Sequence, residues 1–334
     1  MITQAKHAGK AKGIVALCLP LALCLLLAGG LLSPPLAAQA DHASSAFRIV
    51  AYLPDYRVAT LSPASLRYVT DLVFFSLEPT ASGDLDSTRL TPAVAAALQT
   101  IKQRHNINFP AVRLWVTVGG WERSAGFASM AVDAGKRRRF VQALTQLCLS
   151  RQLDGVDFDW EHPAGPAEDA GYTSLLLETH RAFAPHHLKL SVTVAAWQRL
   201  APQAVAAVDF VNLMSYDHPG RHSTLAQAKL DVADFVQQGI PAGKICLGIP
   251  FYGRGISDPA ATQAYADIWA HDHPAPERDE VQGLYFNGPD TVRQKTRFAL
   301  ASHLAGTMVW ELGQDASGKN SLLQAIHQAV KMVP

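Results

Sequence analysis

Cysteine is scarce in this sequence, and net charge is almost absent. Of 334 residues only four are cysteine, and Cys18 and Cys24 lie within the first forty residues. The other two, Cys148 in a helix-like stretch and Cys246 in a strand-like one, are expected to be buried free thiols, which excludes a small scaffold held by disulfides. Lys and Arg number 29 against 28 Asp and Glu, a formal charge of +1. This balance provides no basic field, so we expect no nucleic-acid partner.

Motifs for nucleotides and metals are missing as well. Neither G-x-G-x-x-G nor G-x-x-x-x-G-K-[ST] occurs, so nucleotide binding has no support. The run His271-Asp272-His273 lacks a helical i, i+4 pair, which favours a solvated loop over a metal site. The basic run at residues 136–139 indicates the solvent face of a helix. We therefore expect no metal and no cofactor.

The first forty residues have the pattern of a secretory signal peptide. Lys6, Lys10 and Lys12 precede an uncharged apolar run from Ile14 to Leu32, and Ala38-Gln39-Ala40 is typical of a cleavage site. The run is long enough for an uncleaved membrane anchor, an alternative disfavoured by the proline and the glycine pair that interrupt it. We expect residues 1–40 to be removed, leaving a secreted or periplasmic chain of residues 41–334. This chain is expected to be a monomer without membrane contact.

After the first forty residues, short runs of β-branched and aromatic residues alternate with longer stretches of helical periodicity. This alternation is typical of βα units and a parallel sheet. Eight such runs, with no linker or second composition, predict an α/β fold consisting of one (β/α)8 TIM barrel. The expected strands span Phe47–Pro54, Asp71–Pro79, Val112–Gly120, Leu153–Pro163, Lys189–Trp197, Asp209–His218, Lys244–Arg254 and Gly306–Asp315. The expected helices include Pro92–His105, Gly135–Arg151, Tyr172–Phe183, Thr224–Gln238, Pro289–His303 and Leu322–Lys331.

The seventh and eighth strands are separated by more sequence than one helix and two loops need. The excess predicts a modest insertion, and its first part, Gly255–Gly288, is rich in aromatic residues. These aromatics could wall one side of a site at the carboxyl face of the barrel, or could pack the insertion onto the barrel. They are Tyr265, Trp269, Tyr285 and Phe286.

Four acids follow one another along the fourth expected strand. Because side chains alternate along a strand, Asp157, Asp159 and Glu161 share one face. Clustered buried acids raise one another's pKa, so that one of them holds a proton and can serve as a general acid. Asp154 has the opposite parity and is expected to be a structural hydrogen-bonding residue at the start of the strand.

These four acids spell D-x-x-D-x-D-x-E, and through them the sequence resembles the family 18 glycoside hydrolases. Thr117-Val118-Gly119-Gly120 is similar to the family's S-x-G-G, with Thr in place of Ser, and Met214-Ser215-Tyr216-Asp217 matches M-x-Y-D. Trp310 lies on the last strand, where the family has its floor tryptophan. The resemblance covers residues 41–334.

The resemblance implies substrate-assisted hydrolysis, in which the sugar's own 2-acetamido carbonyl attacks the anomeric carbon. Glu161 would protonate the leaving oxygen and then activate water. Asp159 would stabilise the charge that develops at the acetamido N–H, and Asp157 beneath it would share its proton. Tyr216 would hold the acetamido oxygen in line, and Asp217 would lie near Glu161.

Aromatic residues near the strand ends are candidates for sugar contacts. Trp310 offers a flat face for stacking a pyranose ring. Trp121 and Trp197 could line additional subsites or could simply pack. Tyr52 and Phe75 could complete the wall of the pocket or belong to the core. Met214 and Gly120 complete the expected substrate-binding set.

The function expected from this resemblance is a secreted, retaining endo-β-N-acetylglucosaminidase of the chitinase type. The same chemistry could act instead on peptidoglycan or on the chitobiose core of an N-glycan. A chitin-binding lectin on an inactive barrel is the alternative from another class. The intact Glu161 argues against the lectin, because a protein that only binds sugar needs no proton donor.

Overall fold

Eight parallel strands form a closed barrel in the computed structural model, which describes residues 47–61, 66–108 and 111–332. Each strand pairs with its neighbour, and β1 pairs with both β2 and β13, which closes the ring. The (β/α)8 prediction is thereby confirmed, whereas the predicted signal peptide at residues 1–40 lies outside the described residues. The barrel strands are β1 (Arg48–Pro54), β2 (Asp71–Pro79), β4 (Arg113–Gly119), β5 (Gly155–Asp159), β6 (Lys189–Ala195), β7 (Phe210–Met214), β8 (Ile245–Pro250) and β13 (Gly306–Trp310).

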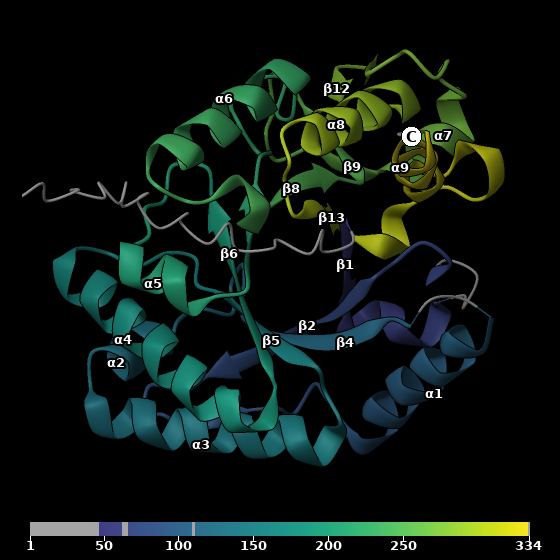
Figure 1. Ribbon diagram of the computed structural model, residues 1–334. Helices are drawn as coiled ribbons and strands as arrows, with labels where there is room; N and C mark the ends of the chain where they lie inside the picture. The colour runs from purple at the N-terminus through teal and green to yellow at the C-terminus, as the bar shows by residue number, and fades with distance from the viewer. Residues whose placement is uncertain (1–46, 62–65, 109–110, 333–334) are drawn as a thin grey trace, which may run out of the picture. The chain divides into compact units, whose positions relative to one another are not determined.

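Helices surround these strands, with α1, α3 and α4 on one side and α6, α8 and α9 on the opposite side (Figure 1). Side chains of Asp133, Thr224 and Ser321 cap the first turns of α3, α6 and α9. Prolines occupy the first turns of α4, α5 and α8. The helices are α1 (Pro92–Asn108), α2 (Phe127–Ala131), α3 (Ala134–Arg151), α4 (Pro166–Phe183), α5 (Pro202–Ala207), α6 (Leu225–Gln237), α7 (Tyr265–Asp272), α8 (Pro289–Ala301) and α9 (Leu322–Lys331).

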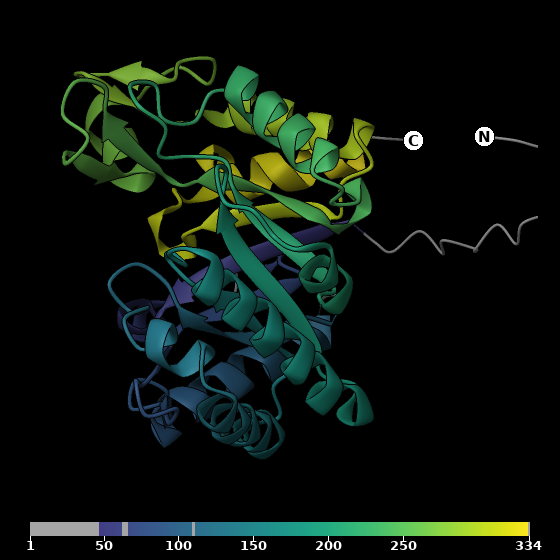
Figure 2. The same ribbon diagram turned by 90° about the vertical axis from the view of Figure 1, so that its left-hand side faces the viewer.

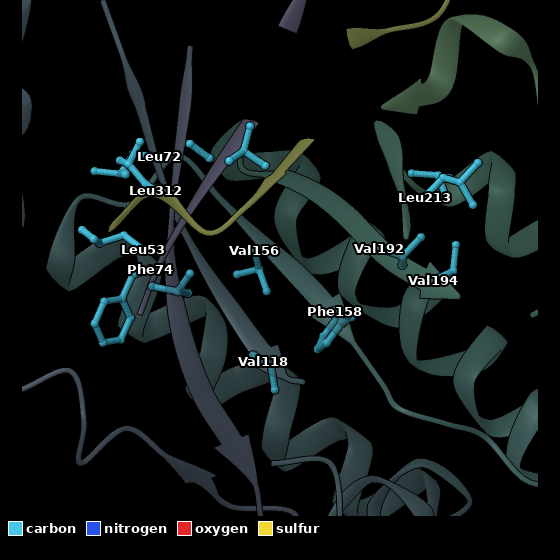
Figure 3. Packing of buried hydrophobic residues seen from close by; sticks show 14 of the residues in the cluster. Leu53, Leu72, Phe74, Val118, Val156, Phe158, Val192, Val194, Leu213 and Leu312 are labelled. Atoms are coloured by element: carbon cyan, nitrogen blue, oxygen red, sulfur yellow. The ribbon is translucent and has the colours of Figure 1, made fainter. Parts of the chain in front are cut away.

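The core consists of two hydrophobic clusters, because alternate residues of each barrel strand face the helices or the inside of the barrel. The larger cluster lies between strands and helices, and Figure 3 shows Leu53, Val156 and Val192 among its outward-facing side chains. The smaller cluster lies inside the barrel and includes Tyr52 and Trp115. Both Cys148 and Cys246 are buried and free, as expected. Among the described residues, no helix is long and apolar enough to cross a membrane.

A charged cluster closes the end of the barrel where the strands begin. Asp71 is fully buried and accepts hydrogen bonds from Arg113 Nε at 2.6 Å, from Arg48 Nη1 at 3.0 Å and from Trp115 Nε1 at 3.0 Å. Burial alone would raise the pKa of Asp71, but the hydrogen bonds and charges of Arg113 and Arg48 outweigh it and lower the pKa. The carboxylate therefore stays ionised and holds three strands together.

The insertion after β8 forms a small antiparallel sheet beside the barrel, shown in green in Figure 2. Tyr265, Tyr285 and Phe286 are buried, and Trp269 packs against the main core. None of these four aromatics lines the large cavity described below, so the packing interpretation is the correct one. The insertion strands are β9 (Tyr252–Gly255), β10 (Thr262–Ala264), β11 (Glu280–Val281) and β12 (Leu284–Tyr285), whereas β3 (Leu85–Asp86) pairs with β2.

Several predicted bounds are wrong, and each has a physical reason. The expected strand Lys244–Arg254 is two strands, because the N–H of Phe251 donates to the carbonyl of Trp310 and the chain then joins the small sheet. The expected helix at residues 172–183 begins earlier, at Pro166, where Glu168 accepts from the N–H of Ala164. The fourth barrel strand ends at Asp159, so Glu161 lies just beyond it.

Candidate active site

A cavity of about 700 Å³ opens where the barrel strands end, which is where (β/α)8 barrels carry their active sites. The structure brings ten of the predicted site residues together in its lining. Asp154, Asp157, Gly119 and Gly120 do not line it. The predicted lining residues are Tyr52, Phe75, Trp121, Asp159, Glu161, Trp197, Met214, Tyr216, Asp217 and Trp310.

Asp157 lies beneath the cavity at the centre of a buried polar network. Its Oδ1 accepts from Ser191 Oγ at 2.7 Å and from Asn212 Nδ2 at 3.2 Å. Its Oδ2 accepts from Tyr52 Oη and Thr193 Oγ1, each at 2.9 Å. Burial raises the pKa of Asp157, and these four hydrogen bonds oppose the rise.

The proton sharing between Asp157 and Asp159 that the sequence predicts stays a prediction. Both oxygens of Asp157 are already engaged, and in the described part of the chain no hydrogen bond joins the two carboxyls. Sequence analysis missed Ser191, Thr193 and Asn212 as partners. The only signal was that each is a polar residue at an inward position of an otherwise apolar strand, which does not name Asp157 as the partner.

Asp159 and Glu161 rise from this network toward the cavity. Asp159 is 4% exposed, and its Oδ1 has no hydrogen-bond partner. Burial, followed by the charges of Glu161 and Asp157, raises its pKa well above the ordinary value. Burial and then the charge of Asp217 raise the pKa of Glu161 to about 7. Near neutral pH this pair therefore retains protons that exposed carboxyls would have lost.

Asp217 is held as an anion opposite Glu161. Its Oδ1 accepts from Tyr252 Oη at 2.6 Å and pairs with Arg254 Nη1 at 2.8 Å and with His222 Nδ1 at 3.4 Å. Burial would raise the pKa of Asp217, but these partners outweigh it and lower the pKa. Two neighbouring carboxyls thus have pKa values pushed in opposite directions, a pattern typical of acid–base sites.

Two consecutive glycines let the chain after β4 pass close to the acid strand. Gly119 and Gly120 have φ values of 95° and 97°, where other residues are strained. A Cβ on Gly119 would lie 2.3 Å from the carbonyl oxygen of Asp159, and one on Gly120 would lie 2.3 Å from the Phe75 ring. The N–H of Gly120 donates to that same carbonyl at 2.6 Å.

Trp310 forms part of the cavity wall on a support of other aromatic rings. Its ring centroid lies 4.6 Å from Phe75 in an edge-to-face contact and 5.7 Å from Tyr52. Phe75 and Tyr52 thus belong to the barrel core and also line the cavity. The Tyr216 hydroxyl, also at the cavity, lies 3.9 Å from Met308 Sδ.

Trp121 and Trp197 line the cavity with most of their surface free, 70% and 63% exposed respectively. The cavity is also lined by polar residues that the sequence did not single out, among them His162, His218 and Arg254. His162 and His218 each directly follow a predicted acid, and this adjacency was their only signal.

Asp154 has the structural role expected of it. Its Oδ2 accepts from the N–H of Leu114 at 2.6 Å and pairs with Lys102, which ties the start of β5 to β4 and α1. His271 and Asp272 are bonded within the insertion, to the carbonyl of Asp267 and to Gln282. Among the described residues, no group of three or more His, Cys, Asp or Glu is arranged to hold a metal ion.

A (β/α)8 barrel with a raised-pKa carboxyl at its carboxyl face has the architecture of a glycoside hydrolase. The family model for glycosyl hydrolases family 18 matches residues 48–315, and the chain belongs to that family.

Known relatives with similar sequences or structures are chitinases by name. Endochitinase 1 of Metarhizium robertsii is 26% identical over 271 residues, covering 64% of this chain and 64% of its own length. The chain thus matches less than two thirds of that relative. The crystal structure of the GH18 chitinase ChiB of Flavobacterium johnsoniae is 25% identical, with a TM-score of 0.76, covering 85% of this chain and 94% of its own. A chitinase from Bacteroides thetaiotaomicron, 22% identical, has the same fold, with a TM-score of 0.74 over 86% and 97% of the two chains.

Proposed function

We propose that this protein is a retaining chitinase that hydrolyses β-1,4 linkages between N-acetylglucosamine units. One observation carries the proposal: Glu161, with its pKa raised to about 7, faces the cavity near an anionic Asp217 and a buried Asp159. A carboxyl that is still protonated near neutral pH can donate a proton to a glycosidic oxygen. The names of the related chitinases support N-acetylglucosamine polymers as the substrate.

The first half of the proposed reaction uses the sugar's own acetamido group as the nucleophile. Glu161 gives its proton to the leaving oxygen while the acetamido oxygen bonds to the anomeric carbon and the bond to the leaving oxygen breaks. The N–H of the acetamido group then needs an acceptor, and the unpartnered Oδ1 of Asp159 supplies one in a buried site. The Tyr216 hydroxyl at the cavity wall is suited to orient the acetamido oxygen.

In the second half, water attacks the anomeric carbon of the oxazolinium ion and gives its proton to the Glu161 carboxylate, while the bond from that carbon to the acetamido oxygen breaks and the neutral acetamido group is restored. The acetamido oxygen blocks one face of the sugar, so water enters from the face that the leaving group vacated. The first product is therefore the β anomer, which NMR of fresh digests detects. A sugar stacked on Trp310 would be held against Asp159 and Tyr216 during both steps.

Replacing Glu161 with Gln tests the proposal. This variant keeps the shape of the side chain but cannot donate a proton, so hydrolysis of chitotetraose should fall by about 10²–10⁴-fold while the protein still binds the sugar. Glu277→Gln, at an exposed position of the insertion, is the matched control and should retain full activity. A Glu161→Gln protein within a few-fold of the parent rate would refute the assignment.

The polymer is part of the proposal, and side-by-side digests distinguish the alternatives. Product release from chitin oligosaccharides, but not from peptidoglycan or a high-mannose glycan, is the expected result. Binding of chitin oligosaccharides with no reducing-sugar release would identify a lectin instead.

We also propose that the protein acts outside the cytoplasm after residues 1–40 are removed. The three lysines, the apolar run and Ala38-Gln39-Ala40 support export. An N-terminus at Asp41 in protein recovered outside the inner membrane is the expected result, and an intact Met1 in that fraction would contradict cleavage.

A further inference from the structure

His162 lies between the proton donor and an exposed tryptophan. Its Nε2 is 3.8 Å from Glu161 Oε2, and its ring meets the Trp197 ring edge-on at 4.5 Å. All three side chains line the large cavity. Since Glu161 protonates the leaving oxygen in the proposed reaction, a side chain beside it in the same cavity is within reach of the sugar that departs.

Gln198 determines which nitrogen of His162 carries the proton. The N–H of Ala195 donates to Gln198 Oε1 at 3.4 Å, which identifies this atom as the amide oxygen. The same oxygen lies 3.3 Å from His162 Nδ1, so Nδ1 must be the donor. In the neutral ring Nε2 then has a free lone pair and can accept a hydrogen bond on the side of Glu161.

The surroundings keep this ring neutral. Burial lowers the pKa of His162, and the hydrogen bond to Gln198 offsets only part of that effect. Besides His162 and Glu161, the titratable or charged groups that line the cavity are Asp159, Asp217, His218, Arg254 and the phenols of Tyr52, Tyr216 and Tyr252. The guanidinium of Arg199 is engaged by Asp234 and by the main-chain carbonyls of Trp197 and Gln198.

We propose that His162 is a substrate-binding residue that selects for a sugar as the leaving group. Its Nε2 accepts a hydrogen bond from a hydroxyl that flanks the leaving oxygen, while Trp197 contacts the apolar face of the same sugar. The inference rests on the proposed function, because it needs Glu161 to mark the position of the leaving oxygen. An aryl leaving group has no such hydroxyl and gains nothing from His162.

Paired substrates and two amide variants test this inference. Gln can place its amide oxygen near the position of Nε2, whereas Asn reaches only the position of Nδ1. His162→Asn and His162→Phe should raise KM for chitotetraose by about 2- to 10-fold, the range for one neutral hydrogen bond, and His162→Gln should restore most of the loss. All three variants should lose less on an aryl chitobioside than on chitotetraose, because the aryl group offers no hydroxyl to Nε2.

Two further readouts separate sugar binding from a structural effect. Transglycosylation needs an acceptor sugar in the same place, so its products should decline in His162→Phe. In the parent, KM for chitotetraose should rise as pH falls through the His162 pKa, because imidazolium cannot accept a hydrogen bond. In His162→Gln this rise should be absent.

The outcomes distinguish this inference from the proposed function. Equal losses on chitotetraose and on the aryl substrate, or unchanged KM and transglycosylation in His162→Phe, would overturn the role of His162 while leaving the chitinase assignment intact. A parent protein that releases no product from either substrate would overturn both.

Discussion

At the scale of single residues, the site depends on keeping one carboxyl protonated beside one that is ionised. Glu161 and Asp217 achieve this through different surroundings: burial acts on both, but only Asp217 has Tyr252, Arg254 and His222 to stabilise its charge. The anion in turn raises the pKa of Glu161. The raised pKa of Glu161 therefore depends on side chains from the insertion, far away in sequence.

This dependence predicts the pH behaviour of an Asp217→Asn variant. With Glu161 as the proposed proton donor, activity should require its protonated form and should be lost as pH rises through its pKa, about 7 in the parent. Removing the Asp217 charge lowers that pKa, so the alkaline limb of kcat/KM should move to lower pH. The alkaline limb is measured from pH profiles of kcat/KM on chitotetraose. Asp169→Asn, at an exposed position of α4, is the control. An unmoved limb would show that burial alone sets the pKa of Glu161.

Some of these residues were predictable from the sequence, because their pattern is local. The acids at positions 157, 159 and 161 share a face through the strand period of two alone. The partners of Asp157 were not predictable, since Ser191 and Asn212 are 34 and 55 positions away. Only the register of β5 against β6, and of β6 against β7, brings them together.

At the scale of elements, the turn after β4 sets the distance between Phe75 and the acid strand. Gly120 combines a positive φ with a close approach to the Phe75 ring, which itself supports Trp310. The site aromatics are therefore positioned by a backbone conformation as much as by side-chain packing.

A Gly120→Ala variant should be destabilised by about 2–4 kcal/mol, from backbone strain together with the displacement of Phe75. Gly239→Ala is the matched control, because Gly239 has a φ of 90° but no atom within 4 Å of the position that a Cβ would take. Denaturant unfolding of both variants gives their losses in unfolding free energy. The difference between the two losses is the contribution of the contact with Phe75, apart from backbone strain. Equal losses would mean that Phe75 moves aside freely.

Element bounds were less predictable than element types. The alternation of apolar runs revealed all eight barrel strands, but the ends of β5 and β8 depend on partners elsewhere. Glu161 N donates to Ser124 Oγ after β4, and Phe251 N donates to the carbonyl of Trp310 at the end of β13. The alternation of residues along one strand carries no information about contacts with other segments of the chain.

At the scale of the whole molecule, stability depends on a buried amine away from the acids of the cavity. Lys295 on α8 is fully buried and donates to Ser223 Oγ at 2.7 Å and to Asn287 Oδ1 at 2.8 Å. Burial lowers its pKa to about 7, although Asp279 and Asp231 favour the charged form. The amino group thus ties α8 to two loops at the carboxyl side of the barrel.

The unfolding free energies of the parent and of Lys295→Met should depend differently on pH, because only the parent has this buried amino group. Above pH 7 the native state has released the proton that the unfolded chain keeps up to about pH 10.4. The parent's unfolding free energy, minus that of the variant, should therefore rise between pH 7 and 9, by at most about 1.4 kcal/mol per pH unit. Lys319→Met, at an exposed position, is the matched control. A flat difference for Lys295→Met would place its native pKa near that of the unfolded chain.

The Asp71 cluster at the strand starts gives the molecule a second electrostatic centre, remote from the first. Under the proposed function, replacing Asp159 or Glu161 should reduce turnover in a protein that still folds, whereas replacing Asp71 or one of its arginines removes the partner of a buried charge and should lower the yield of folded protein. Random variation in this chain therefore divides into two populations. Variants of the first population fold but are inactive, and variants of the second yield little folded protein. Selection can then reshape the carboxyl face for a new glycan while the opposite end of the barrel keeps the fold intact.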